Sequence, residues 1–345
     1  MKKILVVFLV VFIATAVYFS VRYYEYRKFK EKKAVIEDPV TVNVSPGNSW
    51  GKISRKLKKK GVVTSAELFR FLIREKKLDN KLQTGEFEFS EPVSPVEVAE
   101  IISSGKVKLY SFTIPEGYNK YDAAEVFKQK EWINENHLFL NYCNDRSFLK
   151  NLGMTHDGSC EGFLFPSTYK FPRGVNIKTV ITKMYRDMKK TLNSFSEEIK
   201  KSDFNEYRLL TMASIIEKET GAEEERARIA SVFLNRIDRG MKLQTDPTVI
   251  YGMLPEFQGD LKSRHLLKDH EYNTYTRKGF PAGPICFPGK NSIKAVLYPE
   301  ETDYLYFVST RKGFHYFSKN LREHNAAVEH YLIKNRKTPF IWKGR

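Results

Sequence analysis

The sequence has few of the residues that build disulfide-rich folds or metal centres. Its 345 residues include three cysteines, Cys143, Cys160 and Cys286, and seven scattered histidines. One bridge remains an alternative, but an odd and widely spaced set favours ordinary buried thiols and makes no disulfide framework. Because no Cys/His spacing resembles a metal site, we expect neither a metal nor another cofactor.

The sequence also lacks internal repeats, low-complexity runs and any recognised nucleic-acid-binding module. Its formal net charge is +17, yet the basic residues are dispersed, so we expect no nucleic acid partner. A basic protein near a membrane is attracted to anionic lipid headgroups or to acidic cell-wall polymers. For any single cluster, such as residues 56–60, a solvated surface is the alternative.

Long apolar runs are absent except at the N-terminus. The 18 residues 4–21 are apolar apart from Thr15 and Ser20, and basic residues and tyrosines flank them. This run just meets the length of a membrane-spanning helix, and tyrosines are typical of the membrane interface. We therefore expect a single-pass anchor over residues 1–24 in the cell membrane.

A cleaved signal peptide is the competing interpretation of this run. Ala14-Thr15-Ala16 fits the small-x-small cleavage pattern. The apolar run continues over residues 17–21, however, and a cleaved product would begin with these exposed residues. Flanking charge leaves the orientation open. Because the N-terminal tail is short, we expect the large C-terminal portion on the exported side.

The residues after the anchor predict a tether and a small module. Residues 25–39 are expected to form a charged tether, and residues 40–105 a separate module with strands at 41–44 and 85–89. Helices are predicted at 50–59, 66–75 and 95–103. This β-α-α-β order resembles LysM-like domains, which bind N-acetylglucosamine polymers. Trp50 is the candidate sugar contact, and a spacer with Trp50 in its core is the alternative.

Residues 106–340 predict a larger domain in which helices and strands are mixed. Alternating stretches at 109–114 and 305–308 indicate strands, whereas 207–220 and 224–239 have helical patterns. The predicted fold class is α+β: a transmembrane helix, the LysM-like module and this larger mixed domain.

The chemistry of this domain is indicated by an acid and a polar loop. Glu217 lies near the end of an apolar helix, and residues 243–252 follow with amide, hydroxyl and aromatic groups. A proton donor beside groups that hydrogen-bond and stack on sugars is typical of glycosidic bond cleavage. The candidate sugar-binding residues are Gln244, Thr245, Asp246, Tyr251, Asn273 and Tyr275.

Each of these residues also has a structural alternative. Thr-Asp-Pro is common turn chemistry, and Asp246 can cap a helix that begins at Pro247. Tyrosines such as Tyr251 and Tyr275 are more often core residues. For His324 and Asn325 we favour a structural role. Glu161 can either line the cleft or cap its own loop, and both alternatives stay open.

Several segments together resemble one family. They are residues 213–220, 230–236, 243–252, 272–275, 283–285, the Pro288-Gly289 pair and residues 315–325. They are similar to the endolytic murein transglycosylases of the MltG/YceG-like family, and they span most of residues 161–335. The loop at 280–289 departs from the family pattern at Phe280, Ala282 and Phe287.

The resemblance implies a peptidoglycan lytic transglycosylase. Such an enzyme cuts nascent glycan strands between N-acetylmuramic acid and N-acetylglucosamine without adding water, leaves 1,6-anhydromuramyl ends, and limits strand length beside peptidoglycan synthases. By position in the motif, the catalytic glutamate is Glu217. On a helical wheel Glu217 has small neighbours, Ala213 and Ser214, whereas Glu219 is expected to contact a basic residue of another element.

Two other functions stay open. A non-catalytic anchored scaffold would bind glycan through the LysM-like module. A hydrolase would need a second carboxylate, for which Asp246 is the one suggestion. Cys286 is not expected to be a nucleophile, because no paired histidine is identifiable.

Overall fold

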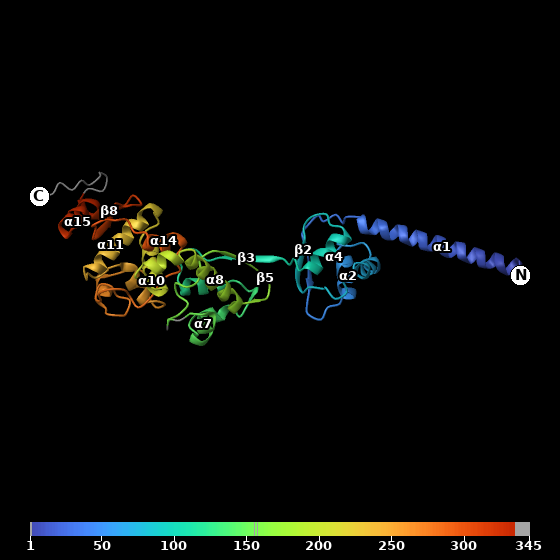
Figure 1. The fold of residues 1–345 in the computed structure, drawn as a ribbon, viewed down its shortest axis with the longest axis horizontal. Helices are drawn as coiled ribbons and strands as arrows, with labels where there is room; N and C mark the ends of the chain where they lie inside the picture. Colours follow the sequence, from blue (N-terminus) through green and yellow to red (C-terminus); the bar gives the residue numbers. More distant parts are fainter. Residues whose placement is uncertain (1, 155, 157, 335–345) are drawn as a thin grey trace. The chain divides into compact units, whose positions relative to one another are not determined.

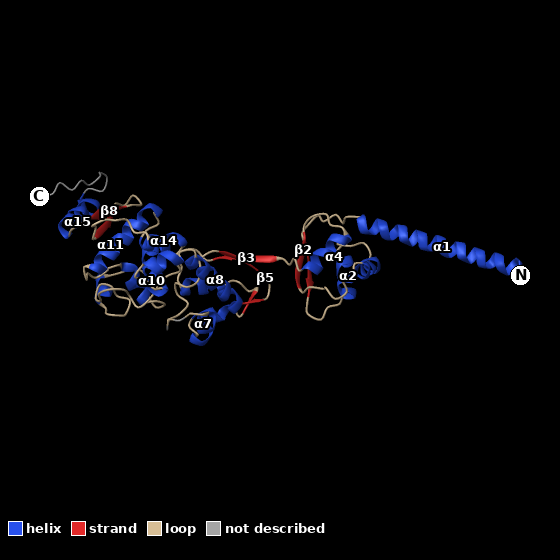
Figure 2. Cartoon of the chain, in the orientation of Figure 1, coloured by secondary structure: helices blue, strands red, loops and turns tan. Residues whose placement is uncertain are grey.

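The structure is a computed structural model that describes residues 2–154, 156 and 158–334. The chain divides into two compact units, drawn in sequence colours in Figure 1. The first comprises Met1–Tyr110 with Lys170–Gly174, and the second comprises Ser111–Tyr169 with Val175–Arg345. Helices dominate and the strands form short pairs (Figure 2), so the class is α+β, as predicted. The predicted domain end at residue 340 lies outside the described residues.

The first unit has the element order that the sequence predicts. Three of its helices begin after a serine whose side chain accepts a backbone N–H of the first turn, which explains where they start. β1 and β2 pair antiparallel. The elements are α1 (Lys2–Glu31), β1 (Val40–Val44), α2 (Trp50–Lys59), α3 (Ala66–Glu75), β2 (Gly85–Phe89) and α4 (Pro95–Ser104).

The core of the first unit contains Trp50 and part of the predicted tether. Trp50 is buried, and its Nε1 donates a hydrogen bond to the Leu78 carbonyl at 2.8 Å. Tyr26 and Phe29, within residues 25–39, are buried in the same core. Trp50 is therefore a core residue, the alternative that the sequence left open.

The N-terminal helix fits a single-pass membrane anchor. Among the described residues, α1 is the one helix that is long and apolar enough to cross a membrane. Its apolar side chains are exposed to the surroundings of the protein, as expected of a helix whose solvent is lipid.

The second unit is built mainly of helices. Among its described residues β4 pairs with β6 in parallel, and β7 pairs with β8 antiparallel. β3 pairs with β5, and the boundary between the units falls within both of these strands. The elements, beginning with the strand that leads into the unit, are β3 (Leu109–Thr113), α5 (Lys120–Lys128), β4 (Ile133–Asn134), α6 (Phe139–Cys143), α7 (Arg146–Leu152), β5 (Thr168–Pro172), β6 (Val175–Asn176), α8 (Ile177–Asn193), α9 (Ser196–Lys201), α10 (Glu206–Glu219), α11 (Arg226–Asp238), α12 (Asp246–Gly252), α13 (Ser263–Leu267), α14 (Lys290–Leu297), β7 (Tyr306–Ser309), β8 (His315–Ser318) and α15 (Leu321–Val328).

Helix α10 lies at the centre of the second unit (Figure 1). Asn205 caps its N-terminus by accepting the Arg208 N–H at 2.9 Å. Residues 209–216 are all buried, and the helix contacts α11, α12 and α14. A helix that is apolar on every side is buried on every side. The core of the unit therefore fixes the end of α10, where the candidate acid lies.

The expectation that all three cysteines are thiols is wrong. Cys143 and Cys160 form a disulfide with a Cα–Cα distance of 4.8 Å, and Cys286 is free and buried. The bridge joins the end of α6 to the loop before β5, where the Cys160 N–H also donates to the Cys143 carbonyl. Sequence spacing alone cannot show that two cysteines 17 residues apart are brought within bonding distance.

Candidate active site

Two glutamates near the end of α10 point to different surroundings. Glu217 and Glu219 are two residues apart, so on a helix their side chains diverge by about 200°. One meets α11 and α14, and the other meets the loop before α12. Their contacts decide which of them is available to a substrate.

Glu217 is held by three protein donors. Its Oε1 lies 3.3 Å from Nη2 of Arg226, and its Oε2 accepts the Gly289 N–H at 2.9 Å and the Ser292 hydroxyl at 2.7 Å. Its side chain is 5% exposed. Burial, together with the nearby charge of Glu217, raises the pKa of Glu116 on the same face. Both oxygens of Glu217 are therefore engaged by the protein.

Glu219 is on the other face and meets a polar pocket. Its Oε1 accepts a hydrogen bond from the Thr245 hydroxyl. Burial raises the pKa of Glu219, and the negative charge of Asp246 raises it further, whereas the Thr245 hydrogen bond lowers it. A carboxyl group with a raised pKa keeps its proton to higher pH, which a general acid requires.

The pocket in front of Glu219 has a volume of about 440 Å³. Four of the predicted sugar-binding residues line it, together with side chains from α11, β7 and α15. The lining residues are Glu219, Phe233, Arg236, Leu243, Gln244, Thr245, Asp246, Tyr275, Tyr306, Phe307, Leu321, His324 and Asn325. The predicted residues Gln244, Thr245, Asp246 and Tyr275 are therefore brought together, and Glu217 is not among the lining residues.

Backbone geometry presents the loop residues to the pocket. Gln244 adopts a left-handed conformation with φ of 51°, and its N–H donates to the Thr274 carbonyl at 3.2 Å. The Thr245 N–H donates to the Thr274 hydroxyl at 3.0 Å. The side chains of Gln244 and Asp246 are exposed, and Asp246 accepts a hydrogen bond from the Tyr275 hydroxyl at 2.6 Å.

The predicted residue Asn273 organises a loop instead of lining the pocket. It is fully buried. Its Nδ2 donates to the carbonyls of Leu266 and Lys268 at 3.0 and 2.8 Å, and its Oδ1 accepts the Tyr275 N–H at 2.8 Å. These hydrogen bonds all join the Asn273 side chain to backbone groups, and they position Tyr275 at the pocket.

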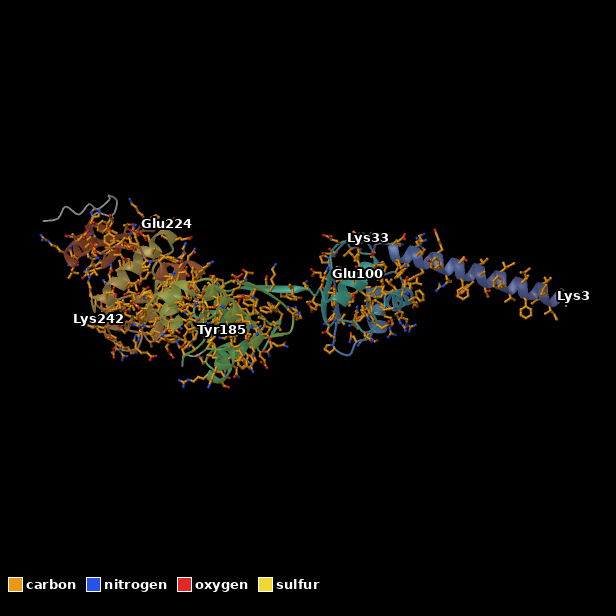
Figure 3. The ribbon with its side chains drawn as sticks, viewed as in Figure 1. Lys3, Lys33, Glu100, Tyr185, Glu224 and Lys242 are labelled. Atoms are coloured by element: carbon orange, nitrogen blue, oxygen red, sulfur yellow. A yellow bond between two sulfur atoms is a disulfide. The ribbon has the colours of Figure 1, made fainter. Side chains whose placement is uncertain are left out.

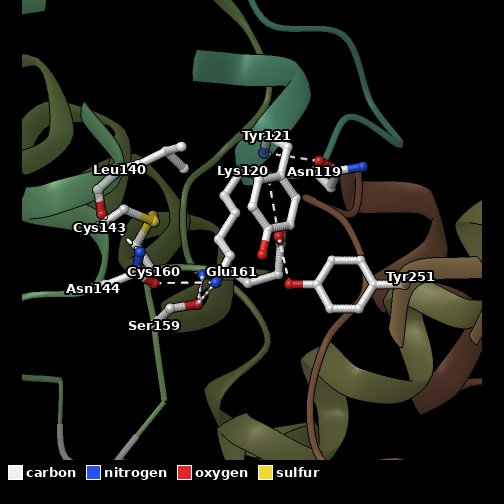
Figure 4. Close-up of a disulfide and its surroundings, with 10 residues drawn as sticks. All are labelled: Asn119, Lys120, Tyr121, Leu140, Cys143, Asn144, Ser159, Cys160, Glu161 and Tyr251. Atoms are coloured by element: carbon white, nitrogen blue, oxygen red, sulfur yellow. Dashed lines mark hydrogen bonds between the residues drawn. A yellow bond between two sulfur atoms is a disulfide. The ribbon is translucent and has the colours of Figure 1, made fainter. Parts of the chain in front are cut away.

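Tyr251 also lies outside the pocket lining. Its hydroxyl donates to Oε2 of Glu161 at 2.9 Å, and the same oxygen accepts the Lys120 N–H at the start of α5 (Figure 4). Burial raises the pKa of Glu161 to about 7. Figure 4 shows this cluster beside the Cys143–Cys160 disulfide. Glu161 therefore joins α5 to α12, a role that differs from both alternatives of the sequence, the cleft lining and the cap of its own loop.

Sequence reasoning missed or undervalued three residues of the pocket. Arg236 is buried and donates to the carbonyls of Leu305 and Leu243 at 2.6 and 2.7 Å, so it holds two walls together. Tyr306 stacks on His324 with a centroid distance of 5.1 Å. Nδ1 of His324 is buried without a hydrogen-bond partner in the described chain. Arg236 and His324 lie in the family-like segments 230–236 and 315–325, which were the available signal, whereas Tyr306 lies outside these segments.

Comparison with known proteins identifies the family. The pattern of the YceG-like family matches residues 42–330. An endolytic murein transglycosylase of Bacillus subtilis is 32% identical over 318 residues, which cover 86% of each chain. An endolytic murein transglycosylase of Streptococcus pneumoniae is 28% identical over 85% of this chain and 58% of its own. The chain belongs to the YceG-like family.

A solved structure of a YceG-like protein agrees with this membership. The protein, from Listeria monocytogenes, is 33% identical and matches with a TM-score of 0.57 over 85% of this chain and all of its own. The match therefore extends to the fold as well as to the sequence.

In this member of the YceG-like family the divergent loop at residues 280–289 packs behind α10. The Ile285 N–H donates to the Ser214 hydroxyl at 3.0 Å, and the Cys286 thiol lies 3.3 Å from the Ser214 carbonyl oxygen. Burial raises the pKa of the Cys286 thiol. A buried thiol of raised pKa is a poor nucleophile, as the sequence predicted.

Proposed function

We propose that this chain is a membrane-anchored lytic transglycosylase that cuts peptidoglycan glycan strands internally and so limits their length. Its family and its relatives named endolytic murein transglycosylase support this reaction class. The observation that carries the assignment is the Glu219 carboxyl group, which lines a 440 Å³ pocket beside Thr245 and Asp246. The cut bond is the one between N-acetylmuramic acid and N-acetylglucosamine.

Glu219, in place of the predicted Glu217, is the acid in this proposal. Its raised pKa favours the protonated form, and it lines the pocket. Glu217 has both oxygens engaged by Arg226, Gly289 and Ser292, and a sugar would have to displace these donors. The two residues share one motif, so the family resemblance alone does not separate them.

One carboxyl group is enough for the reaction. Protonated Glu219 gives its proton to the glycosidic oxygen as the bond from that oxygen to muramyl C1 breaks. The resulting carboxylate then takes the proton of the muramyl C6 hydroxyl, and the oxygen of this hydroxyl forms the new bond to C1. The strand then ends in a 1,6-anhydro ring, Glu219 is protonated again, and no water is consumed.

The other pocket residues hold the sugars in this proposal. The exposed amide of Gln244 suits the acetamido groups, and Asp246 with the Tyr275 hydroxyl suits sugar hydroxyls. Tyr306, whose ring contacts His324 and the Arg236 guanidinium, forms part of the pocket wall. Thr245 fixes the position of the Glu219 carboxyl group through its hydrogen bond.

Asp246 keeps a hydrolase as the second candidate. It lines the same pocket as Glu219, so a water molecule between the two carboxyl groups would have both an acid and a base. The two reactions leave different chain ends, because only hydrolysis adds a water oxygen to C1.

The first unit supports two further parts of the proposal. A cavity of about 460 Å³ lies there beside Asn48, Trp50 and Asp79, and we propose it as the glycan site of a LysM-like module. A scaffold that only binds glycan would use this cavity without the Glu219 pocket. We also propose that the anchor is uncleaved, that the second unit lies on the exported side, and that the enzyme works beside peptidoglycan synthases.

Mass spectrometry of strand ends in heavy-oxygen water tests the function. Full-length protein in detergent is incubated with uncrosslinked glycan strands, and the Glu219→Gln variant is the control. We expect unlabelled 1,6-anhydromuramyl ends with the parent protein and none with the variant. Labelled reducing ends would establish the hydrolase, and strand binding without new ends would establish the scaffold.

A further inference from the structure

Helix α1 continues past the apolar run into the core of the first unit. The run ends at Val21, but the helix continues to Glu31 without a break. Tyr26 and Phe29, on this continuation, are each 5% exposed and belong to the core of the unit. Figure 3 labels Lys3 near the start of the helix and Lys33 just beyond its end. The apolar run and the first unit are therefore joined by one rigid helix.

Helix α3 packs directly against this continuation. The Tyr26 hydroxyl donates to Glu75, and Nζ of Lys30 lies 3.1 Å from Oε1 of the same carboxylate. The ring of Phe71 meets the ring of Tyr26 edge to face, with centroids 4.8 Å apart. Phe71 is nevertheless 57% exposed. The Phe71 ring therefore contacts the helix on one side and is open on the other.

The rise of the helix places Phe71 at the membrane surface. Tyr26 is five positions after Val21, and at a rise of 1.5 Å per residue this is about 8 Å along the helix. The headgroup layer on each side of the hydrocarbon core is about 5–8 Å thick. If residues 4–21 span the membrane, Tyr26 and the Phe71 ring beside it lie at the outer part of this layer. Aromatic side chains are typical of that depth.

The residues around Phe71 carry excess positive charge. Arg70 and Arg74, one turn apart on α3, lie on the same side of Phe71, and both are exposed. Arg27 and Lys28 are exposed on α1, and no ion pair is recorded for any of these four side chains within the described residues. The acidic side chains nearby are Glu25, which pairs with Arg22, Glu75, which pairs with Lys30, and the exposed Glu31 and Glu67.

We propose that Phe71, with Arg70, Arg74, Arg27 and Lys28, forms a docking surface for anionic lipid headgroups. This inference rests on the proposed membrane anchor. The Phe71 ring enters the interface, and the four basic side chains contact lipid phosphates. Surface cations are attracted to an anionic leaflet. The first unit is thereby fixed on the membrane surface and does not move freely at the end of a tether.

Quenching by brominated lipids tests this docking. Full-length protein is reconstituted in nanodiscs that contain anionic lipid, and a tryptophan is introduced at one site at a time. Phe71→Trp reports on the proposed surface, Phe12→Trp on the apolar run, and Leu109→Trp on an exposed apolar position at the start of β3 in the same unit. The emission of the parent protein is subtracted from that of each variant.

We expect brominated lipid to quench the added emission of Phe12→Trp and Phe71→Trp but not that of Leu109→Trp. With Arg70 and Arg74 intact, quenching at position 71 should be stronger in anionic than in zwitterionic discs. In the Arg70→Gln/Arg74→Gln background it should fall and should be equal in the two kinds of disc. Quenching at position 12 without quenching at 71 would overturn the docking and leave the anchor intact. No quenching at position 12 would overturn both.

Discussion

The two faces at the end of α10 carry the same chemical group in opposite settings. On one face Glu217 neutralises buried Arg226 and ties α10 to α14 through Gly289 and Ser292. On the other face Glu219 has a single hydroxyl partner, Thr245, and lines an open pocket. A carboxylate saturated by protein donors stabilises the fold, whereas one left partly unsatisfied and desolvated is available for chemistry.

The largest expected effect is on the pocket face. Glu219→Gln keeps the shape and the Thr245 contact but removes the proton that the reaction transfers. General acid–base catalysis is worth about 10²–10⁴-fold, so we expect the rate of strand cleavage to fall by a factor in this range, which leaves no detectable new strand ends. Turnover of uncrosslinked strands measures it, with circular dichroism as the control for folding. Cleavage at the parental rate would remove Glu219 from the mechanism.

A substitution on the Glu217 face should lower the free energy of unfolding. Arg226→Met leaves Glu217 buried without its cation, and breaking a buried ion pair costs about 3–5 kcal/mol of unfolding free energy. Urea denaturation measures this loss, and turnover per folded molecule should stay near the parental value at low temperature. Lys200→Met, which breaks the exposed pair with Glu197, is the matched control and should change little. An unchanged midpoint for Arg226→Met would show that this face is not structural.

A smaller effect is expected from the pocket lining. Gln244→Ala removes an exposed amide that we propose hydrogen-bonds an acetamido group. One such bond contributes about 1 kcal/mol, so kcat/KM should fall roughly fivefold to tenfold. Gln258→Ala, at an exposed glutamine outside the pocket lining, should leave kcat/KM unchanged. Equal effects of the two variants would exclude a specific contact at Gln244.

The smallest effects are shifts of the pH profile in opposite directions. Activity requires protonated Glu219, so it falls as the pH rises through the pKa of this group. The charge of Asp246 raises this pKa, and the Thr245 hydrogen bond lowers it. Asp246→Asn should therefore move the alkaline limb of kcat/KM to lower pH, and Thr245→Val should move it to higher pH. Shifts of the same sign would mean that another group controls this limb.

Local sequence signals predicted the helices and strands near the site. The helical pattern at 207–220 matches α10 within one residue at each end, and the alternation at 305–308 matches β7 within one residue. Of the predicted sugar-binding residues, Gln244, Thr245, Asp246 and Tyr275 line one pocket, and their role toward sugars stays a prediction. Gln244, Thr245 and Asp246 are consecutive on one loop, and Tyr275 follows Thr274, which that loop contacts.

The choice between the two glutamates was beyond local reasoning. A helical wheel compares neighbours on the same helix, but the deciding partners of Glu217 are 72 and 75 residues away, at Gly289 and Ser292. The partner of Glu219, Thr245, is 26 residues away. Ser214, one of the small side chains beside Glu217, contacts Ile285 and Cys286 of the loop before α14. The Cys143–Cys160 bridge was missed for the same reason, since both depend on tertiary contacts.

The most direct test compares Glu217→Gln with Glu219→Gln under identical conditions. The rate at which 1,6-anhydromuramyl ends form is measured for each full-length variant and divided by its folded fraction. We predict that Glu217→Gln is less stable than the parent but still forms these ends, and that Glu219→Gln is folded and forms none. A folded, inactive Glu217→Gln beside an active Glu219→Gln would contradict the assignment and restore Glu217 as the acid.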